Sequence, residues 1–166
     1  MILISVAIFW GCSGQQQLTS AKVDIDGTDM LFGRISRAQL FYDFPEWEKG
    51  YKTYAVDSSV ITKLNRTGYD GQILLFLGTW CHDSMREVPR FFRILDRSGL
   101  YNADKISIWA VDRAKKLADN TTDTYDVYFV PTIIFMKDNR EIGRIVERPE
   151  KRLEDDMLKI ISGEND

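Results

Sequence analysis

The chain has 166 residues, of which 44% are hydrophobic and 28% are charged, and its formal net charge is −3. This length and composition are typical of one globular domain with a single buried core. The slight acidic excess argues against nucleic acid as a partner, because no basic surplus exists to neutralise phosphates. His82 is the only histidine. Zinc and copper sites usually draw on several His or Cys ligands, so we expect neither a metal nor another cofactor.

The first eleven residues differ in composition from the rest of the chain. An apolar run covers residues 2–10, which is the length of a signal-peptide core and too short to cross a bilayer as a helix. A glycine, Cys12 and a polar segment follow. This order resembles a bacterial lipoprotein signal, which implies that residues 1–11 are removed, that Cys12 carries the lipid and that residues 12–21 form a tether. Such a protein would lie in the cell envelope, lipid-anchored and facing the periplasm. A buried N-terminal strand in a cytoplasmic protein is the alternative.

Residues 22–69 are predicted to form an extension that packs on the main domain. Aromatic residues concentrate in its middle, where a ligand-binding shelf is one interpretation and helices that pack their rings on the core are the commoner use. These residues are Phe41, Tyr42, Phe44, Trp47, Tyr51 and Tyr54. The expected elements are one or two strands in 22–35 with a turn at Asp26–Gly27, a helix over 37–42 capped by Ser36, a short helix that begins at Pro45, and a helix capped by Asp57 that ends near Gly68.

From residue 72 onward, strand and helix patterns alternate. A nearly continuous apolar run predicts a central strand covered on both faces, and an apolar stripe with Phe91, Phe92 and Leu95 predicts a helix after it. Asp138–Asn139 between two apolar runs predicts a hairpin. The expected elements are a strand over 72–78, a helix over 84–95 bent at Pro89, a strand over 105–111, helical turns over 113–119 and 122–126, strands over 132–137 and 141–147, and a helix from Pro149 to Gly163.

Two short motifs lie at particular places in this order. Trp80-Cys81-His82-Asp83-Ser84 follows the central strand and opens the helix, and Val130-Pro131-Thr132 directly precedes the hairpin. At this spacing, and within the order β-α-β-α-β-β-α, the two motifs resemble the thioredoxin family over residues 70–163. The resemblance implies an α/β, thioredoxin-like fold: a central mixed sheet flanked by helices, preceded here by a helical and strand extension. It also implies that Pro131 follows a cis peptide bond and faces Cys81, and that the Val130 backbone pairs with a bound substrate chain.

Several residues depart from the pattern of the family. Ser84 stands where the second, resolving cysteine is usual, and Leu75 where reducing members carry a buried acid that deprotonates that cysteine. The joint loss is coherent, because a base for the second thiol has no use without that thiol. The remaining departures are His82-Asp83 in place of Gly-Pro, and Asn139 and Glu147 in place of typical glycines.

Cys81 is the expected nucleophile of the motif. N–H groups at a helix start favour the thiolate form of a cysteine placed there. Ser84, one helical turn on, is expected to direct its hydroxyl at the sulfur and favour the anion further. A protonated His82 would help and Asp83 would oppose this effect. The residues expected to contact a substrate are Trp80, His82, Val130, Pro131 and Thr132.

A lone thiolate can attack a disulfide and form a mixed disulfide, but it cannot release its partner by forming an internal disulfide. The motif therefore excludes a dithiol reductase cycle. It leaves isomerase-like reshuffling, monothiol exchange and covalent holding of a client, with thiol- or disulfide-containing proteins or small thiols as partners. A non-catalytic thioredoxin-like binding module is the alternative. Metal delivery through Cys81 and His82 is disfavoured, because adjacent residues on a helix diverge. We expect a monomer whose only contact with a membrane is the lipid anchor.

Overall fold

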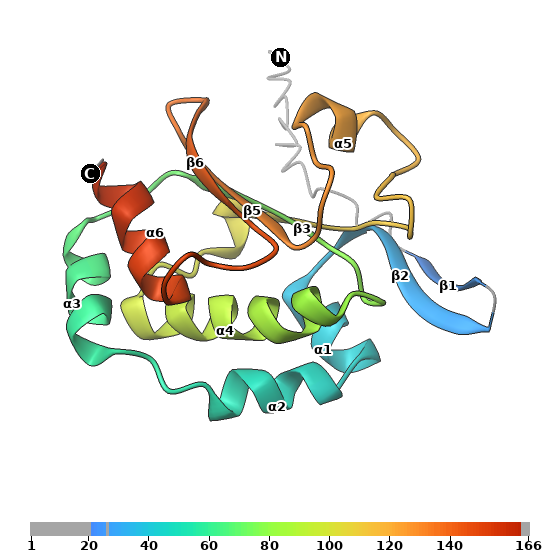
Figure 1. The fold of residues 1–166 in the computed structure, drawn as a ribbon, viewed down its shortest axis with the longest axis horizontal. Coiled ribbons are helices and arrows are strands. Elements are labelled where there is room, and N and C mark those ends of the chain that lie inside the picture. Colours follow the sequence, from blue (N-terminus) through green and yellow to red (C-terminus); the bar gives the residue numbers. More distant parts are fainter. Residues whose placement is uncertain (1–20, 26, 164–166) are drawn as a thin grey trace, which may run out of the picture.

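The protein is a mixed α/β structure built on one six-stranded sheet (Figure 1). The computed structural model describes residues 21–25 and 27–163, and the expectations for the signal segment and Cys12 lie outside these residues. The strands are β1 Ala21–Ile25, β2 Thr28–Ile35, β3 Gln72–Leu77, β4 Ile106–Ala110, β5 Thr132–Lys137 and β6 Arg140–Val146. The helices are α1 Arg37–Asp43, α2 Glu46–Thr53, α3 Ser58–Arg66, α4 His82–Ser98, α5 Thr121–Thr124 and α6 Leu153–Ser162, with a 3₁₀ turn at Ala103–Lys105.

The order of the strands across the sheet is β1-β2-β4-β3-β5-β6. β3 pairs in parallel with β4 and antiparallel with β5, so the sheet is mixed. β5 and β6 form the expected hairpin, in which Asp138 and Asn139 take φ values of 51° and 60°. Asp and Asn tolerate this left-handed region better than most residues do. The fold class is thus α/β with a central mixed sheet.

The N-terminal extension contributes two strands to the same sheet. β1 and β2 form an antiparallel hairpin, and the N–H of Gly27 in its turn donates to Asp24 Oδ1 at 2.9 Å. β2 then pairs antiparallel with β4, with Gly33 opposite Ala110. The extension therefore joins the main domain through backbone hydrogen bonds as well as through side-chain packing.

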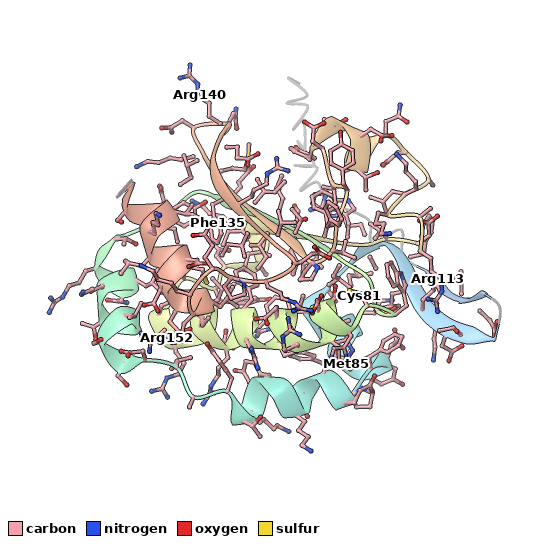
Figure 2. All side chains as sticks on the ribbon, viewed as in Figure 1. Cys81, Met85, Arg113, Phe135, Arg140 and Arg152 are labelled. Atoms are coloured by element: carbon pink, nitrogen blue, oxygen red, sulfur yellow. The ribbon has the colours of Figure 1, made fainter. Side chains whose placement is uncertain are left out.

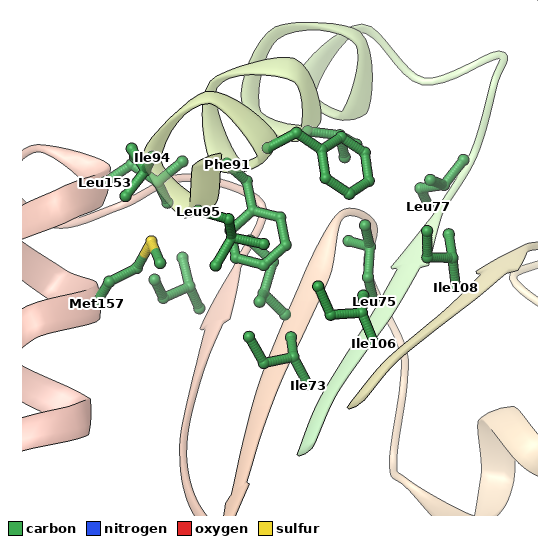
Figure 3. Packing of buried hydrophobic residues seen from close by; sticks show 14 of the residues in the cluster. Ile73, Leu75, Leu77, Phe91, Ile94, Leu95, Ile106, Ile108, Leu153 and Met157 are labelled. Atoms are coloured by element: carbon green, nitrogen blue, oxygen red, sulfur yellow. The ribbon is translucent and has the colours of Figure 1, made fainter. Parts of the chain in front are cut away.

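Side chains of β3 alternate between two cores. Ile73, Leu75 and Leu77 face α4 and α6 (Figure 3), whereas Leu74 and Phe76 belong to a second cluster. Helices α1–α4 and α6 lie on one side of the sheet, and the short α5 with its flanking loops lies on the other (Figure 1). Burial of each large aliphatic side chain stabilises the fold by about 1.5–3 kcal/mol, so β3 anchors both layers.

The aromatic residues of the extension pack inward, as the commoner interpretation predicted. Trp47 on α2 is fully buried. Phe41 contacts Tyr51 and Phe92, with ring centroids 5.8 and 5.9 Å apart. Tyr42 is the exception, because it is exposed on the surface. The rings thus attach α1 and α2 to α4.

Several predicted boundaries are corrected by the structure. α4 begins at His82, two residues before the expected start, and Pro45 is the N-cap of α2 instead of its first residue. α6 begins at Leu153 and not at Pro149. The Asp156 carboxylate explains this difference, because it accepts the N–H of Glu150 at 2.6 Å and so draws that residue out of the helix.

The expected helix over 113–119 is absent, and a tight turn takes its place. The Asp112 carboxylate accepts the N–H of Lys116 at 2.7 Å, and the Asp112 N–H donates to the Lys116 carbonyl at 3.2 Å. Lys115 has a φ of 61°, which a right-handed helix does not allow. A side chain that bonds the nearby backbone has outcompeted the helical hydrogen bonds. Across residues 21–25 and 27–163, no helix has the length and apolar character needed to cross a membrane.

Candidate functional site

Cys81 lies at the junction between the central strand and the longest helix. A turn closed by the Cys81 N–H and the Gly78 carbonyl, 2.9 Å apart, carries the chain from β3 into α4. Cys81 is the N-cap residue of α4, with extended backbone angles, and its carbonyl accepts the N–H of Met85 at 2.9 Å. Its side chain is partly exposed and is the one cysteine side chain in the described part of the chain. The predicted position at a helix start is confirmed.

The Cys81 thiol donates to the carbonyl oxygen of Val130, with Sγ 3.2 Å from that oxygen. The Val130–Pro131 peptide bond is cis, as expected. The Pro131 carbonyl accepts the N–H of Glu147 at 2.7 Å, so the residue that follows β6 holds this loop in place. The tertiary structure therefore brings the two sequence motifs into direct contact.

Trp80 precedes Cys81 in the chain, and its indole is hydrogen-bonded to the residue that follows β4. Its Nε1–H donates to the Val111 carbonyl at 3.0 Å. A Cβ atom on Gly78 would come within 2.7 Å of the ring, so a glycine is needed where the indole crosses the turn. The guanidinium of Arg113 and the ammonium of Lys115 lie 5.6 and 5.9 Å from the centroid of the ring. Arg113 and Cys81 are labelled in Figure 2.

Ser84 has a different hydrogen-bond partner from the one expected. Its side chain is completely buried, and its Oγ accepts the N–H of Gly78 at 3.2 Å. Ser84 thereby secures the turn that leads from β3 to Cys81. Leu75 is also fully buried, inside the larger core, at the position where the resemblance implies an acid in reducing members.

The remaining two residues of the pentapeptide differ in exposure. His82 is exposed, and Asp83 forms ion pairs with Arg86 at 2.8 Å and with Arg148 at 3.2 Å. Burial by itself raises the pKa of Asp83, but the hydrogen bonds from Arg148 and Arg86 outweigh it and hold that pKa below its ordinary value. The Asp83 carboxylate is therefore ionised and its charge is shared by two arginines.

The Val130 loop presents a mixture of buried and exposed groups. Val130, Pro131 and Thr132 are buried, and the Thr132 hydroxyl donates to the Phe129 carbonyl at 2.7 Å. Thr132 thus holds the loop from within. Tyr128 and Phe129, which precede the motif, are 67% and 53% exposed. Two large apolar rings at that exposure are unusual for a loop whose neighbours are buried.

Four residues that contact the two motifs were missed in the sequence: Arg113, Lys115, Phe129 and Arg148. None belongs to a motif, and the turn that places Lys115 was itself predicted to be helical. The one available signal was the aromatic pair Tyr128-Phe129 before the Val130 motif. The sequence alone did not show whether these rings are buried or exposed. Among residues 21–25 and 27–163, no group of three His, Cys, Asp or Glu side chains is arranged to hold a metal ion.

Comparisons with known proteins indicate the fold class alone. No protein-family model and no curated protein matches this chain. Among solved structures, a protein of unknown function from Pseudomonas aeruginosa is similar over 77% of this chain and 87% of its own, with a TM-score of 0.50 at 15% identity. An HIV epitope-scaffold matches 77% of this chain and 78% of its own, with a TM-score of 0.43 and 15% identity. The first likeness agrees with a mixed α/β fold.

Proposed function

We propose that this protein is a thioredoxin-like thiol–disulfide exchange protein in which Cys81 is the single nucleophile. The observation that carries the proposal is the partly exposed Cys81 thiol at the start of α4, 3.2 Å from the Val130 carbonyl. The mixed sheet, with β3 between β4 and β5, is consistent with a thioredoxin-like fold. The N–H groups of the first turn of α4 favour a negative charge at this position.

The proposed reaction is exchange without net oxidation. The Cys81 thiolate attacks one sulfur of a disulfide, the S–S bond of the substrate breaks, and a mixed disulfide forms between Cys81 and the substrate. The other substrate sulfur leaves as a thiolate and takes up a proton. A thiol of the substrate itself, or a small thiol, then attacks the mixed disulfide and releases Cys81. The result is reshuffling of the substrate or transfer of its thiol partner.

Substrate binding and release of the thiol are linked through Val130. Its carbonyl accepts the Cys81 thiol. A substrate backbone that pairs with Val130 as an added strand would donate an N–H to that carbonyl and displace the thiol from it. The thiol would lose its acceptor as the disulfide arrives, which would free the sulfur for attack.

An internal resolving step is not part of the proposal. Ser84 carries no thiol and its hydroxyl oxygen bonds Gly78. Leu75 supplies no base, because it is an apolar side chain in the core. Both features favour an isomerase-like or monothiol cycle over a dithiol reductase cycle.

The proposed location is the cell envelope, with lipid on Cys12 and the domain facing the periplasm. This part of the proposal rests on the apolar run over 2–10 and the polar segment after Cys12. In the native host, Cys12→Ala should move the protein from the membrane fraction to the soluble fraction and abolish incorporation of labelled palmitate. A Cys81→Ala variant is the matched control and should keep both.

Trapping of mixed disulfides tests the redox proposal. Cells that express the protein are quenched with acid, free thiols are alkylated, and adducts are separated without reductant. Discrete adducts that collapse on reduction and are missing in Cys81→Ala would support exchange. The absence of adducts in the unchanged protein, or their persistence in Cys81→Ala, would contradict it.

A non-catalytic binding module is the second candidate, and the exposed rings of Tyr128 and Phe129 favour it. Such a module would bind its partner through apolar contacts without covalent attachment. Co-purification of a partner that is unchanged in Cys81→Ala but lost in the double variant Tyr128→Ser/Phe129→Ser would identify this second role.

A further inference from the structure

A cluster of positive charge surrounds the ring next to the proposed nucleophile. We define the Trp80 cation cluster as Trp80, Arg113 and Lys115. Both cations lie within 6 Å of the centroid of one indole, a distance at which cation–π attraction is significant. Trp80 directly precedes Cys81 in the chain, so the cluster includes the residue next to the proposed nucleophile.

The backbone sets the position of the cluster. The turn that carries Arg113 and Lys115 is closed by the Asp112 carboxylate, which accepts the N–H of Lys116 at 2.7 Å. Lys115 occupies a left-handed conformation with a φ of 61°. The indole is fixed by its hydrogen bond to Val111 at 3.0 Å. Hydrogen bonds therefore hold the indole and the backbone turn that carries the two cations.

Within the described part of the chain, no carboxylate forms an ion pair with either cation of the cluster. The adjacent Lys116, by contrast, pairs with Asp123. Arg113 instead donates to the Thr28 hydroxyl at 3.5 Å, and the Asp112 carboxylate is engaged by the Lys116 N–H.

On the other flank of Cys81, arginines pair with the acidic side chains of the first turns of α4. There the single carboxylate of Asp83 is shared by Arg86 and Arg148. Glu87, further along α4, is bonded by Arg86 and Arg90. Each of these two carboxylates is thus paired with two arginines.

We propose that the Trp80 cation cluster binds acidic side chains of the polypeptide that exchanges with Cys81. This proposal rests on the proposed function and specifies its substrate class: a cysteine-containing segment flanked by Asp or Glu. Guanidinium and ammonium groups bind carboxylates through charge-assisted hydrogen bonds, and the indole gives the segment a flat apolar contact. A positive surface also raises the rate of encounter with an acidic partner.

Three peptides test the proposal. Each holds one cysteine activated as a mixed disulfide with 2-thiopyridine, flanked by Glu, Ser or Lys and otherwise identical. The Cys81 thiolate attacks the peptide sulfur, the mixed disulfide with the peptide forms, and 2-thiopyridone leaves and is measured by its absorbance. At low ionic strength we expect the Glu peptide to react about three- to tenfold faster than the Ser peptide, and the Lys peptide more slowly than both.

Charge-removing variants and added salt test whether Arg113 and Lys115 cause the preference for the Glu peptide. In the double variant Arg113→Gln/Lys115→Gln, the Glu peptide should react at most about twofold faster than the Ser peptide. The same small difference is expected for the unchanged protein in 0.5 M NaCl, because salt screens the charges. The matched control is Lys137→Gln/Arg140→Gln, which removes the same charge at the far end of the β5–β6 hairpin (Figure 2) and should keep the preference. Equal rates for the three peptides, or a preference retained in Arg113→Gln/Lys115→Gln, would overturn this inference while leaving exchange by Cys81 intact. Failure of all three peptides to react would overturn the proposed function as well.

Discussion

The Sγ of Cys81 lies 3.2 Å from the carbonyl oxygen of Val130, a residue 49 positions away in the chain. This contact joins the start of α4 to the loop that precedes β5. It also places the thiol against a backbone acceptor that an incoming strand could use. The chemistry of the site therefore depends on the position of one carbonyl as much as on the cysteine.

The buried Ser84 hydroxyl yields a first prediction. Ser84→Ala leaves the Gly78 N–H buried without its acceptor, so the free energy of unfolding should fall by about 1–3 kcal/mol. The rate of Cys81 alkylation by iodoacetamide at pH 7 should change less than about twofold, because the Ser84 hydroxyl bonds the Gly78 N–H and not the Cys81 sulfur. Urea denaturation and the alkylation rate are the two measurements. A large loss of alkylation rate with unchanged stability would instead place the hydroxyl on the sulfur.

A second thiol at the same position should change the fate of the mixed disulfide. In Ser84→Cys the new thiol lies one helical turn from Cys81 and can attack the adduct internally, so the lifetime of a Cys81–peptide mixed disulfide should shorten by about tenfold or more. Mass spectrometry of the adduct over time measures this. Arg97→Cys adds a thiol at the exposed far end of α4 and should leave the lifetime unchanged. Equal lifetimes in the two variants would contradict the geometry assigned to α4.

Leu75 provides a prediction about the missing acid. Because the side chain is fully buried in the core, Leu75→Asp places a carboxyl group without a partner among apolar neighbours, and the free energy of unfolding should fall by about 3 kcal/mol or more. Leu75→Met conserves volume and should cost less than about 1.5 kcal/mol. Thermal or urea unfolding distinguishes the two. A well-folded Leu75→Asp protein would show that this core accepts an acid.

Glu147 has a left-handed backbone, with a φ of 56°. A non-glycine residue pays a steric cost in this region, and glycine does not. Glu147→Gly should therefore raise the free energy of unfolding by about 0.5–1 kcal/mol, whereas Glu147→Ala should bring no gain. Urea denaturation of both variants tests this, and equal effects would show that the side chain matters more than the backbone.

A half-buried tyrosine that bonds a buried glutamate predicts a loss of stability at high pH. Tyr54 donates to Glu154 Oε2 at 2.6 Å, and burial followed by this bond raises the pKa of Tyr54 well above its ordinary 10.0. The fold therefore favours the protonated phenol. The contribution of the Tyr54 phenol to stability is complete below pH 10 and is lost as the pH rises further. Above pH 10 the phenol ionises in the unfolded chain, whereas the folded protein keeps it protonated.

Tyr54→Phe tests this pair. At pH 7 the free energy of unfolding of the variant should be lower by about 1–3 kcal/mol, because the buried Glu154 loses a hydrogen-bond donor. The variant should therefore unfold at a lower urea concentration. Its stability should then fall less steeply above pH 10 than that of the unchanged protein. Tyr42→Phe alters an exposed ring and is the control. Parallel pH profiles for Tyr54→Phe and the unchanged protein would contradict the assignment.

Local signals in the sequence predicted much of the secondary structure. Ser36 and Asp57 cap their helices as expected, with each side chain accepting backbone N–H groups, and Gly163 ends α6 with a φ of 72°. The prediction of a helix over 113–119 failed at Asp112. Its side chain also bonds a nearby N–H, but it closes a turn where a helix was predicted. The same short polar side chain favours either outcome, and residues close in sequence do not decide between them.

The sequence by itself determined that Cys81 follows an apolar strand and opens a helix, because hydrophobic periodicity and helix starts are encoded by neighbouring residues. The tertiary structure decided what surrounds that thiol. The Val130 carbonyl beside it, the Gly78 partner of Ser84 and the approach of Arg113 to Trp80 all depend on how β3, β4 and β5 align. Such contacts join residues far apart in the chain, and the packing of the two cores across the sheet brings them together.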